Sequence, residues 1–261
     1  MFEEVVVPPV LMYHSVTPQL YGAEPFTVST KSFERQMHWL HHRNYKGVSL
    51  KEILEAPRQS SSRRSVALTF DDGYADFSEY AMPVLRHYGF SATVFAIAGQ
   101  LGNESSWTTE PRKPLMTASQ LRQIAAEGIE IGSHALHHVR LTSLADEALH
   151  EDLVMSRSIL QDISQQDVRG FCYPHGDHDG RVVRAAQEAG FDYSCAVGYS
   201  DFTGRYALPR INIEDGDSSL QLWRKAALYW LRWEYRGPGS RILAAASAVR
   251  ATRSLAAASK S

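Results

Sequence analysis

The stretch ALTFDDGYADF, residues 67–77, sets two adjacent aspartates at the end of an apolar run. Asp71 and Asp72 would repel each other there and lose hydration, so the pair needs a cationic partner. Gly73 follows directly, and a tight turn with a glycine at positive φ would explain the stretch without any function. The choice between a turn and a site therefore depends on what the rest of the chain brings to this point.

Short apolar runs alternate with helical patterns over most of the chain. Strands are expected at 65–70, 92–98 and 129–134, and helices are expected to begin with capping boxes at Ser49 and Thr117. This alternation predicts a mainly parallel sheet that is either open or closed into a barrel. In such barrels the functional site lies at the carboxyl ends of the strands.

Four polar clusters follow expected strands. They are the YH pair ending at His14, the DDG of 71–73, the SHALHH of 133–138 and the YPHG of 173–176. All four fall where a barrel would gather side chains around one site. The positions of these clusters therefore favour a shared site over isolated turns.

His134 and His138 are four residues apart, so on one helical turn both would lie on the same face. That spacing suits two imidazoles on one metal ion, whereas His137 would point elsewhere. One of the two aspartates can supply a third ligand and leave open positions for water and substrate. The metal would lower the pKa of its water, and the second aspartate would serve as general base.

These residues resemble the polysaccharide deacetylase superfamily, the NodB-like domain of carbohydrate esterase family 4. TFDDG matches the first family motif, SHALHH the metal motif and CYPHG the third motif. The opening VLMYHSV is similar to the branch that contains poly-N-acetylglucosamine de-N-acetylases. The resemblance implies a deformed (β/α) barrel of about seven strands and metal-dependent removal of acetyl groups from sugars. Zinc is the expected metal, with cobalt, nickel or iron as alternatives.

The resemblance also implies a role for each matching residue. Asp71 is the expected general base, and Asp72, His134 and His138 are the expected metal ligands. His14 is the expected acid that protonates the leaving amine.

The third motif departs from the family at one position. The arginine that normally pairs with the base aspartate is Cys172 here, and Arg210 in the later LPR stretch is the expected substitute. A backbone N–H of the YPHG turn would bind the oxyanion, in a wall shaped by Tyr173, Pro174 and His175. Trp107 either lines the substrate groove or anchors its own loop.

The C-terminal part is a separate feature. We predict a catalytic domain over 1–217 and a helical extension over 218–261. Residues 218–236 predict a helix with an apolar face and basic residues elsewhere. The apolar face is Leu222, Ala226, Tyr229, Trp230 and Trp233, and the basic residues are Arg224, Lys225, Arg232 and Arg236. This pattern is typical of a helix that packs across the barrel, or of one that lies on a membrane surface.

Composition limits the other possibilities. The net charge of −2 gives no reason to expect nucleic acid, and the two cysteines do not form a disulfide framework. The acidic N-terminus and the lack of a long apolar run predict a cytoplasmic protein, with peripheral contact at the inner membrane face if the extension binds lipid.

The motifs predict an N-deacetylase that acts on an acetylated amino-sugar glycan or its precursor. An O-acetyl carbohydrate esterase would share the same metal, base and acid. A glycan-binding protein without turnover is the third hypothesis, and Cys172 is its main support. Oligomeric state is not predicted.

Overall fold

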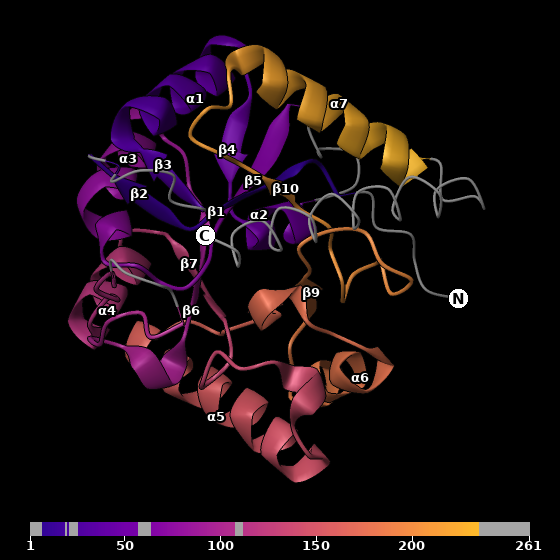
Figure 1. Cartoon of the computed structure of the whole chain (residues 1–261). Helices are drawn as coiled ribbons and strands as arrows, with labels where there is room; N and C mark the ends of the chain where they lie inside the picture. Colours follow the sequence, from indigo (N-terminus) through magenta and orange to yellow (C-terminus); the bar gives the residue numbers. More distant parts are fainter. Residues whose placement is uncertain (1–6, 19, 21–25, 57–63, 108–111, 235–261) are drawn as a thin grey trace, which may run out of the picture.

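A computed structural model describes residues 7–18, 20, 26–56, 64–107 and 112–234 of the chain (Figure 1). The strands are β1 (Val10–Tyr13), β2 (Ser15–Thr17), β3 (Thr27–Ser29), β4 (Lys46–Val48), β5 (Ser65–Phe70), β6 (Thr93–Ala96), β7 (Glu130–Ser133), β8 (Gly170–Cys172), β9 (Tyr193–Cys195) and β10 (Ile211–Asn212). The α-helices are α1 (Thr30–His42), α2 (Leu50–Glu55), α3 (Met82–Tyr88), α4 (Ala118–Ala126), α5 (Asp146–Ser164), α6 (Gly180–Glu188) and α7 (Ser219–Glu234).

The main sheet is parallel and curls into a barrel. Its strands follow the order β10-β1-β5-β6-β7-β8-β9, and β4 pairs with the first half of β5. Leu208 bridges to Cys195 of β9, and Ile211 pairs with Leu11 of β1, so residues 208–211 connect the two ends of the sheet. The predicted deformed (β/α) barrel is confirmed.

Helix starts and stops follow local chemistry. The predicted capping boxes are present: Ser49 with Glu52 begins α2, and Thr117 with Gln120 begins α4. Gly89 ends α3 in the left-handed conformation, with a φ of 65°. These signals are local in sequence, which is why these helix starts and ends were predictable.

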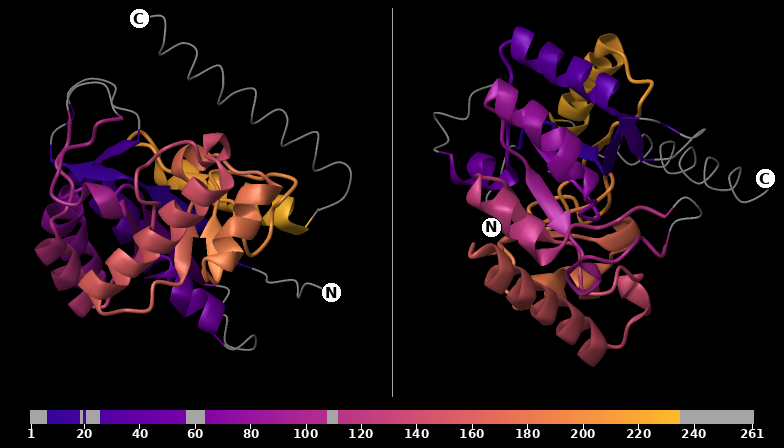
Figure 2. Two further views of the ribbon diagram at one scale, coloured as in Figure 1. Left: turned by 90° about the horizontal axis from the view of Figure 1, so that it is seen from below. Right: turned by 90° about the vertical axis from the view of Figure 1, so that its left-hand side faces the viewer.

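The barrel core comes from the strands. Every residue of β1, β6 and β7 is buried, as expected for parallel strands that are covered on both faces. Large aromatic rings such as Phe70, Phe95 and Phe171 are at most 1% exposed. Helices surround this sheet on the outside (Figure 2). Polar residues at the strand ends are therefore held on a rigid frame.

Helix α7 packs against α1 and β10 (Figure 1). Leu222 and Tyr229 are buried, and Ala226 packs against the same core, as the barrel-packing interpretation predicted. The rest of the predicted extension, residues 235–261, lies outside the described residues. No helix among the described residues is long and apolar enough to cross a membrane.

Candidate active site

The carboxyl ends of four strands supply most of the site, and the residue before a fifth strand completes it. His14 follows β1, Asp71 follows β5 and His134 follows β7, while Cys172 ends β8 and Arg210 directly precedes β10. Parallel strands bring these ends to one rim of the barrel. The polar clusters that the sequence placed after strands therefore share one location.

Asp72, His134 and His138 form a buried triad. Oδ1 of Asp72 lies 3.3 Å from Nε2 of His134 and 3.3 Å from Nε2 of His138. The three residues are 5%, 3% and 7% exposed. Burial alone would raise the pKa of Asp72, but hydrogen bonds from the two imidazoles hold this pKa well below its usual range.

The two histidines do not lie on a helical turn, so that part of the sequence prediction is wrong. Residues 134–140 form no helix, and Ala135 and His138 have φ angles of 67° and 55°. These left-handed residues fold the loop back on itself, and the fold-back brings the second imidazole to Asp72. The four-residue spacing thus indicated two histidines that do lie together, but a left-handed loop rather than a helical turn brings them there.

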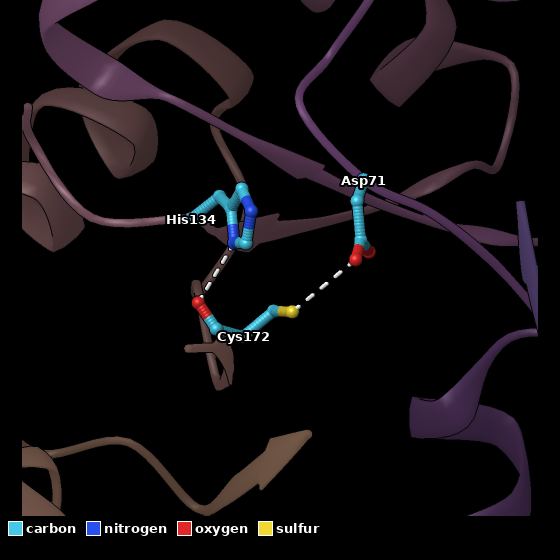
Figure 3. Close-up of side chains that lie close together, drawn as sticks. All are labelled: Asp71, His134 and Cys172. Atoms are coloured by element: carbon cyan, nitrogen blue, oxygen red, sulfur yellow. Dashed lines mark hydrogen bonds between the residues drawn. The ribbon is translucent and has the colours of Figure 1, made fainter. Parts of the chain in front are cut away.

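The ring of His134 is oriented by a backbone oxygen. Its Nδ1 lies 2.8 Å from the carbonyl oxygen of Cys172, and the two residues come from neighbouring strands (Figure 3). A proton on Nδ1 satisfies that carbonyl, so Nε2, which points at Asp72, is the nitrogen on which a metal ion would replace a proton. This arrangement is what a metal-binding histidine requires.

The loop that carries His138 is held by Asp152 of α5, a residue that the sequence analysis missed. Oδ1 of Asp152 accepts the backbone N–H of Leu136 at 2.8 Å, and Oδ2 lies 2.9 Å from Nδ1 of His137. Asp152 is 3% exposed and lies between Leu149 and Leu153 on the buried face of its helix. A carboxylate on an apolar helical face was the signal available in the sequence.

Asp71 is paired with Arg210. The guanidinium donates two hydrogen bonds of 2.7 Å, one to each carboxylate oxygen of Asp71. Both residues are buried, and burial alone would raise the pKa of Asp71. The charge and hydrogen bonds of Arg210 outweigh burial and lower this pKa. The structure thus places Arg210 where the sequence analysis expected the substitute for the missing arginine.

Cys172 leaves room for that pair. Its Sγ lies 3.1 Å from Nη2 of Arg210 and 3.5 Å from Oδ2 of Asp71 (Figure 3). A larger side chain at this position on β8 would collide with the guanidinium, because all three groups are buried together. The cysteine is therefore the counterpart of the arginine that enters from β10.

His14 approaches Asp71 from β1. Its Nε2 lies 3.8 Å from Oδ2 of Asp71, and its ring packs 4.7 Å from the ring of Phe26. Burial lowers the pKa of His14, and the negative charge of Asp71 opposes this effect only in part. The imidazole is within reach of the same carboxylate that Arg210 orients.

Only some residues of the YPHG turn face the site. His175 reaches the site, with its ring 4.5 Å from that of His138. The hydroxyl of Tyr173 instead donates to the backbone oxygen of Tyr206, and Pro174 is buried. Trp107 packs 4.2 Å from the ring of His138, so this loop residue contacts the triad.

Two groups of side chains have metal-binding geometry among the described residues. One is Asp72 with His134 and His138, and the other is Asp71 with His134 and Cys172. Asp71 is already paired with Arg210, and burial raises the pKa of the Cys172 thiol, which keeps it protonated. The donor set of two imidazoles and one carboxylate therefore fits a divalent ion better.

Comparisons with known proteins identify the family of the chain. Residues 58–194 match the family model described as polysaccharide deacetylase. YxkH of Bacillus subtilis, which bears the same family name, is 30% identical over 215 residues, covering 80% of this chain and 72% of YxkH. The poly-β-1,6-N-acetyl-D-glucosamine N-deacetylase of Staphylococcus aureus is 27% identical over 203 residues, covering 73% of this chain and 69% of that protein.

The fold also has solved counterparts. The deacetylase PplD of Streptococcus pyogenes, solved in complex with acetate, superposes with a TM-score of 0.74 at 22% identity. The match covers 85% of this chain and 98% of PplD. This likeness concerns the fold, and the family match comes from the sequence.

Proposed function

Because the chain belongs to the polysaccharide deacetylase family, we propose that it is a metal-dependent hydrolase that removes acetyl groups from N-acetylated amino sugars of a glycan or its precursor. One observation carries the proposal. The Asp71–Arg210 pair lies directly beside the triad of Asp72, His134 and His138. A base that is kept ionised next to an open metal site is the arrangement that hydrolysis of an amide needs.

Asp72, His134 and His138 would hold the metal. A divalent ion bound there would polarise the acetyl carbonyl and lower the pKa of a water molecule. Zinc suits two imidazoles and one carboxylate, and cobalt, nickel or iron also accept these ligands. The Cys172 carbonyl holds His134 in the tautomer that the role requires.

Asp71 takes the proton of the attacking water in this proposal. Arg210 keeps the carboxylate ionised and fixes its direction through two hydrogen bonds. His14 then protonates the nitrogen that leaves, because an amine leaves poorly as an anion. Its lowered pKa makes His14 a stronger acid once it is protonated.

The YPHG turn is the proposed oxyanion contact. Pro174 has no N–H, and the N–H of Tyr173 donates to the backbone oxygen of Cys195 at 3.2 Å. The backbone N–H of His175 is therefore our candidate donor. Tyr173 and Pro174 support the turn rather than contact the substrate.

The name of a similar protein suggests the substrate class. The Staphylococcus aureus protein is named for N-deacetylation of poly-β-1,6-N-acetyl-D-glucosamine. We propose an N-acetylglucosamine glycan for this chain as well, with Trp107 beside His138 as part of the groove wall. All proposed site residues lie within the catalytic domain predicted over 1–217.

Acetate release tests the proposal. The full chain would be loaded with zinc and incubated with N-acetylglucosamine oligomers, with the polymer and with O-acetylated sugars. Chelated protein and Asp71→Asn should release no acetate. Asp167→Asn, which makes the same change at a carboxylate that is 63% exposed, should match the wild type.

Two outcomes would contradict the proposal. Preferred release from O-acetylated sugars would make the protein an esterase. No acetate from any substrate at full metal occupancy would favour a glycan-binding protein without turnover.

A further inference from the structure

Helix α7 has a second apolar face that does not pack into the core. Leu222 and Tyr229 point inward and are 2% and 3% exposed. Roughly opposite them on the helix are four large apolar side chains that are about half exposed or more. They are Leu220 (65%), Trp223 (55%), Leu228 (49%) and Leu231 (52%), here called the outer face of α7.

Exposed apolar side chains are more frequent on α7 than on the rest of the described surface. Nine large hydrophobic side chains are exposed among the described residues, and four of them lie on this single helix. Single exposed apolar residues are ordinary on protein surfaces, but a contiguous group marks an interaction site. Helix α7 runs along the outside of the molecule beside α1 (Figures 1 and 2). Because Leu222 and Tyr229 are its buried side, the exposed side chains lie on the side away from the core.

Charge is distributed unevenly along the chain. The whole sequence has 27 basic and 29 acidic residues. Residues 219–261 include eight of the basic residues and one of the acidic residues, which leaves 19 basic and 28 acidic in residues 1–218. A cationic segment on an acidic protein indicates an anionic partner.

Cations also surround the outer face in the structure. Arg224 is exposed on α7 itself. A cavity of about 270 Å³ adjoins the helix, and Trp223, Arg43 and Arg64 line it. Both of these arginines are exposed, so the outer face meets a cationic rim at Trp223.

The acidic residues that precede α7 are already bonded within the protein. Asp217 accepts hydrogen bonds from Nζ of Lys225 at 2.5 Å and from the backbone N–H of Glu214 at 2.8 Å. Asp215 accepts two hydrogen bonds from Ser29, of 2.8 and 2.6 Å. These two carboxylates are therefore bonded to partners other than the arginines of the rim.

We propose that the outer face of α7 docks onto an anionic membrane surface. Leucine and tryptophan side chains would enter the interface between headgroups and acyl chains, while the rim arginines would contact lipid phosphates. A second copy of the chain fits less well. A twofold contact through this face would bring the arginines of one protomer against those of the other.

Vesicle co-flotation of the full chain tests the proposal. Phosphatidylcholine vesicles would be compared with vesicles that also contain phosphatidylglycerol, at low and high salt. We expect the wild type to bind the anionic vesicles at least about tenfold more tightly, with binding weakened by salt. The combined variant Leu220→Ser, Leu228→Ser and Leu231→Ser should lose about tenfold or more of this binding.

A matched control comes from α5. Val154 and Met155 are 37% and 44% exposed there, so changing both to Ser removes apolar surface at a site without the cationic rim. This control should bind vesicles like the wild type. Arg43→Glu with Arg64→Glu should weaken binding about tenfold and reduce its salt dependence. Thermal unfolding of each variant shows whether it is folded.

Three results would overturn the proposal. The first is equal binding of the wild type to neutral and anionic vesicles, or no binding to either. The second is wild-type binding by the folded leucine variant, which would place the contact elsewhere. The third is a dimer of the wild type that the leucine variant abolishes while vesicle binding is absent, which would assign the face to a second copy.

Discussion

Asp71 and Asp72 are neighbours in the chain, yet they belong to two different regions of the site. Asp71 faces the β8 and β10 side, where Arg210 neutralises it with two hydrogen bonds. Asp72 faces the loop after β7, where two imidazoles contact one of its oxygens. Asp72 has a φ of 69°, which ends the strand geometry and separates the two side chains. The two adjacent carboxylates are therefore held by different kinds of partner, a guanidinium for Asp71 and two imidazoles for Asp72. In the proposed mechanism the first serves as the base and the second as a metal ligand.

The sharpest test of this division is to remove each carboxylate separately. Asp71→Asn should lower kcat about a thousandfold while the protein still binds metal, because the base is lost and the triad is intact. Asp72→Asn should lose activity to the same extent and also lose the metal, because a ligand is removed. Acetate release and metal content measured on the same samples check both. Equal metal content in the two variants would break the comparison.

A substitution of Arg210 tests the partner of Asp71 without changing the triad. Arg210→Met should lower kcat about a hundredfold and destabilise the protein by about 3 kcal/mol, because Asp71 is left buried without its partner. Urea unfolding and acetate release measure these effects.

The exchange between Cys172 and Arg210 can be tested in the same background. Adding Cys172→Arg to Arg210→Met places a guanidinium on β8, at the position that the family resemblance implies for the arginine. Partial recovery of both stability and activity is expected. No recovery, in a double variant that folds, would contradict the idea that the two positions share one function.

Asp152 holds the loop that carries His138, one of the proposed metal ligands. Asp152→Asn weakens the hold on the backbone of Leu136 and on His137. Metal affinity should fall about tenfold, because supporting groups keep ligands in place. Metal titration of this variant beside Asp167→Asn checks the prediction, and unchanged affinity would show that the loop keeps its shape alone.

The last effect concerns stability rather than activity, and it comes from Asp76, a third carboxylate in the same stretch, on which the charge of Lys113 acts. Burial raises the pKa of Asp76 to about 6, although a 2.5 Å hydrogen bond from Ser15 opposes the shift. The folded state thus binds this proton more tightly than the unfolded state does. Its contribution to stability is present below about pH 4 and is lost as the pH rises through about 6.

Asp76→Asn should remove the loss of stability that deprotonation of Asp76 causes as the pH rises. Between pH 4 and pH 7 the free energy of unfolding of the wild type should fall relative to the variant by about 2 kcal/mol. Denaturant unfolding at several pH values gives the difference. Parallel stability curves for the two proteins would show that Asp76 does not titrate in this range.

Local sequence patterns determined two helix starts and the mainly parallel sheet, and the resemblance to a family added the barrel. Capping boxes at Ser49 and Thr117 and the alternation of apolar runs are local patterns, and they specify local structure directly. The same local patterns predicted polar residues at strand ends, the spacing of His134 and His138 indicated two metal ligands, and the family resemblance separated the expected roles of Asp71 and Asp72.

Tertiary structure decided how those residues meet. Arg210 and Asp71 are 139 residues apart, and only the strand order that sets β10 beside β1 brings them into contact. Packing also decided three other features. They are the left-handed residues of the histidine loop, the contact of Asp152 with that loop and the exposure of the outer face of α7. Periodicity encodes what a segment becomes, whereas contacts between distant segments depend on the closed sheet, which no single stretch of sequence describes.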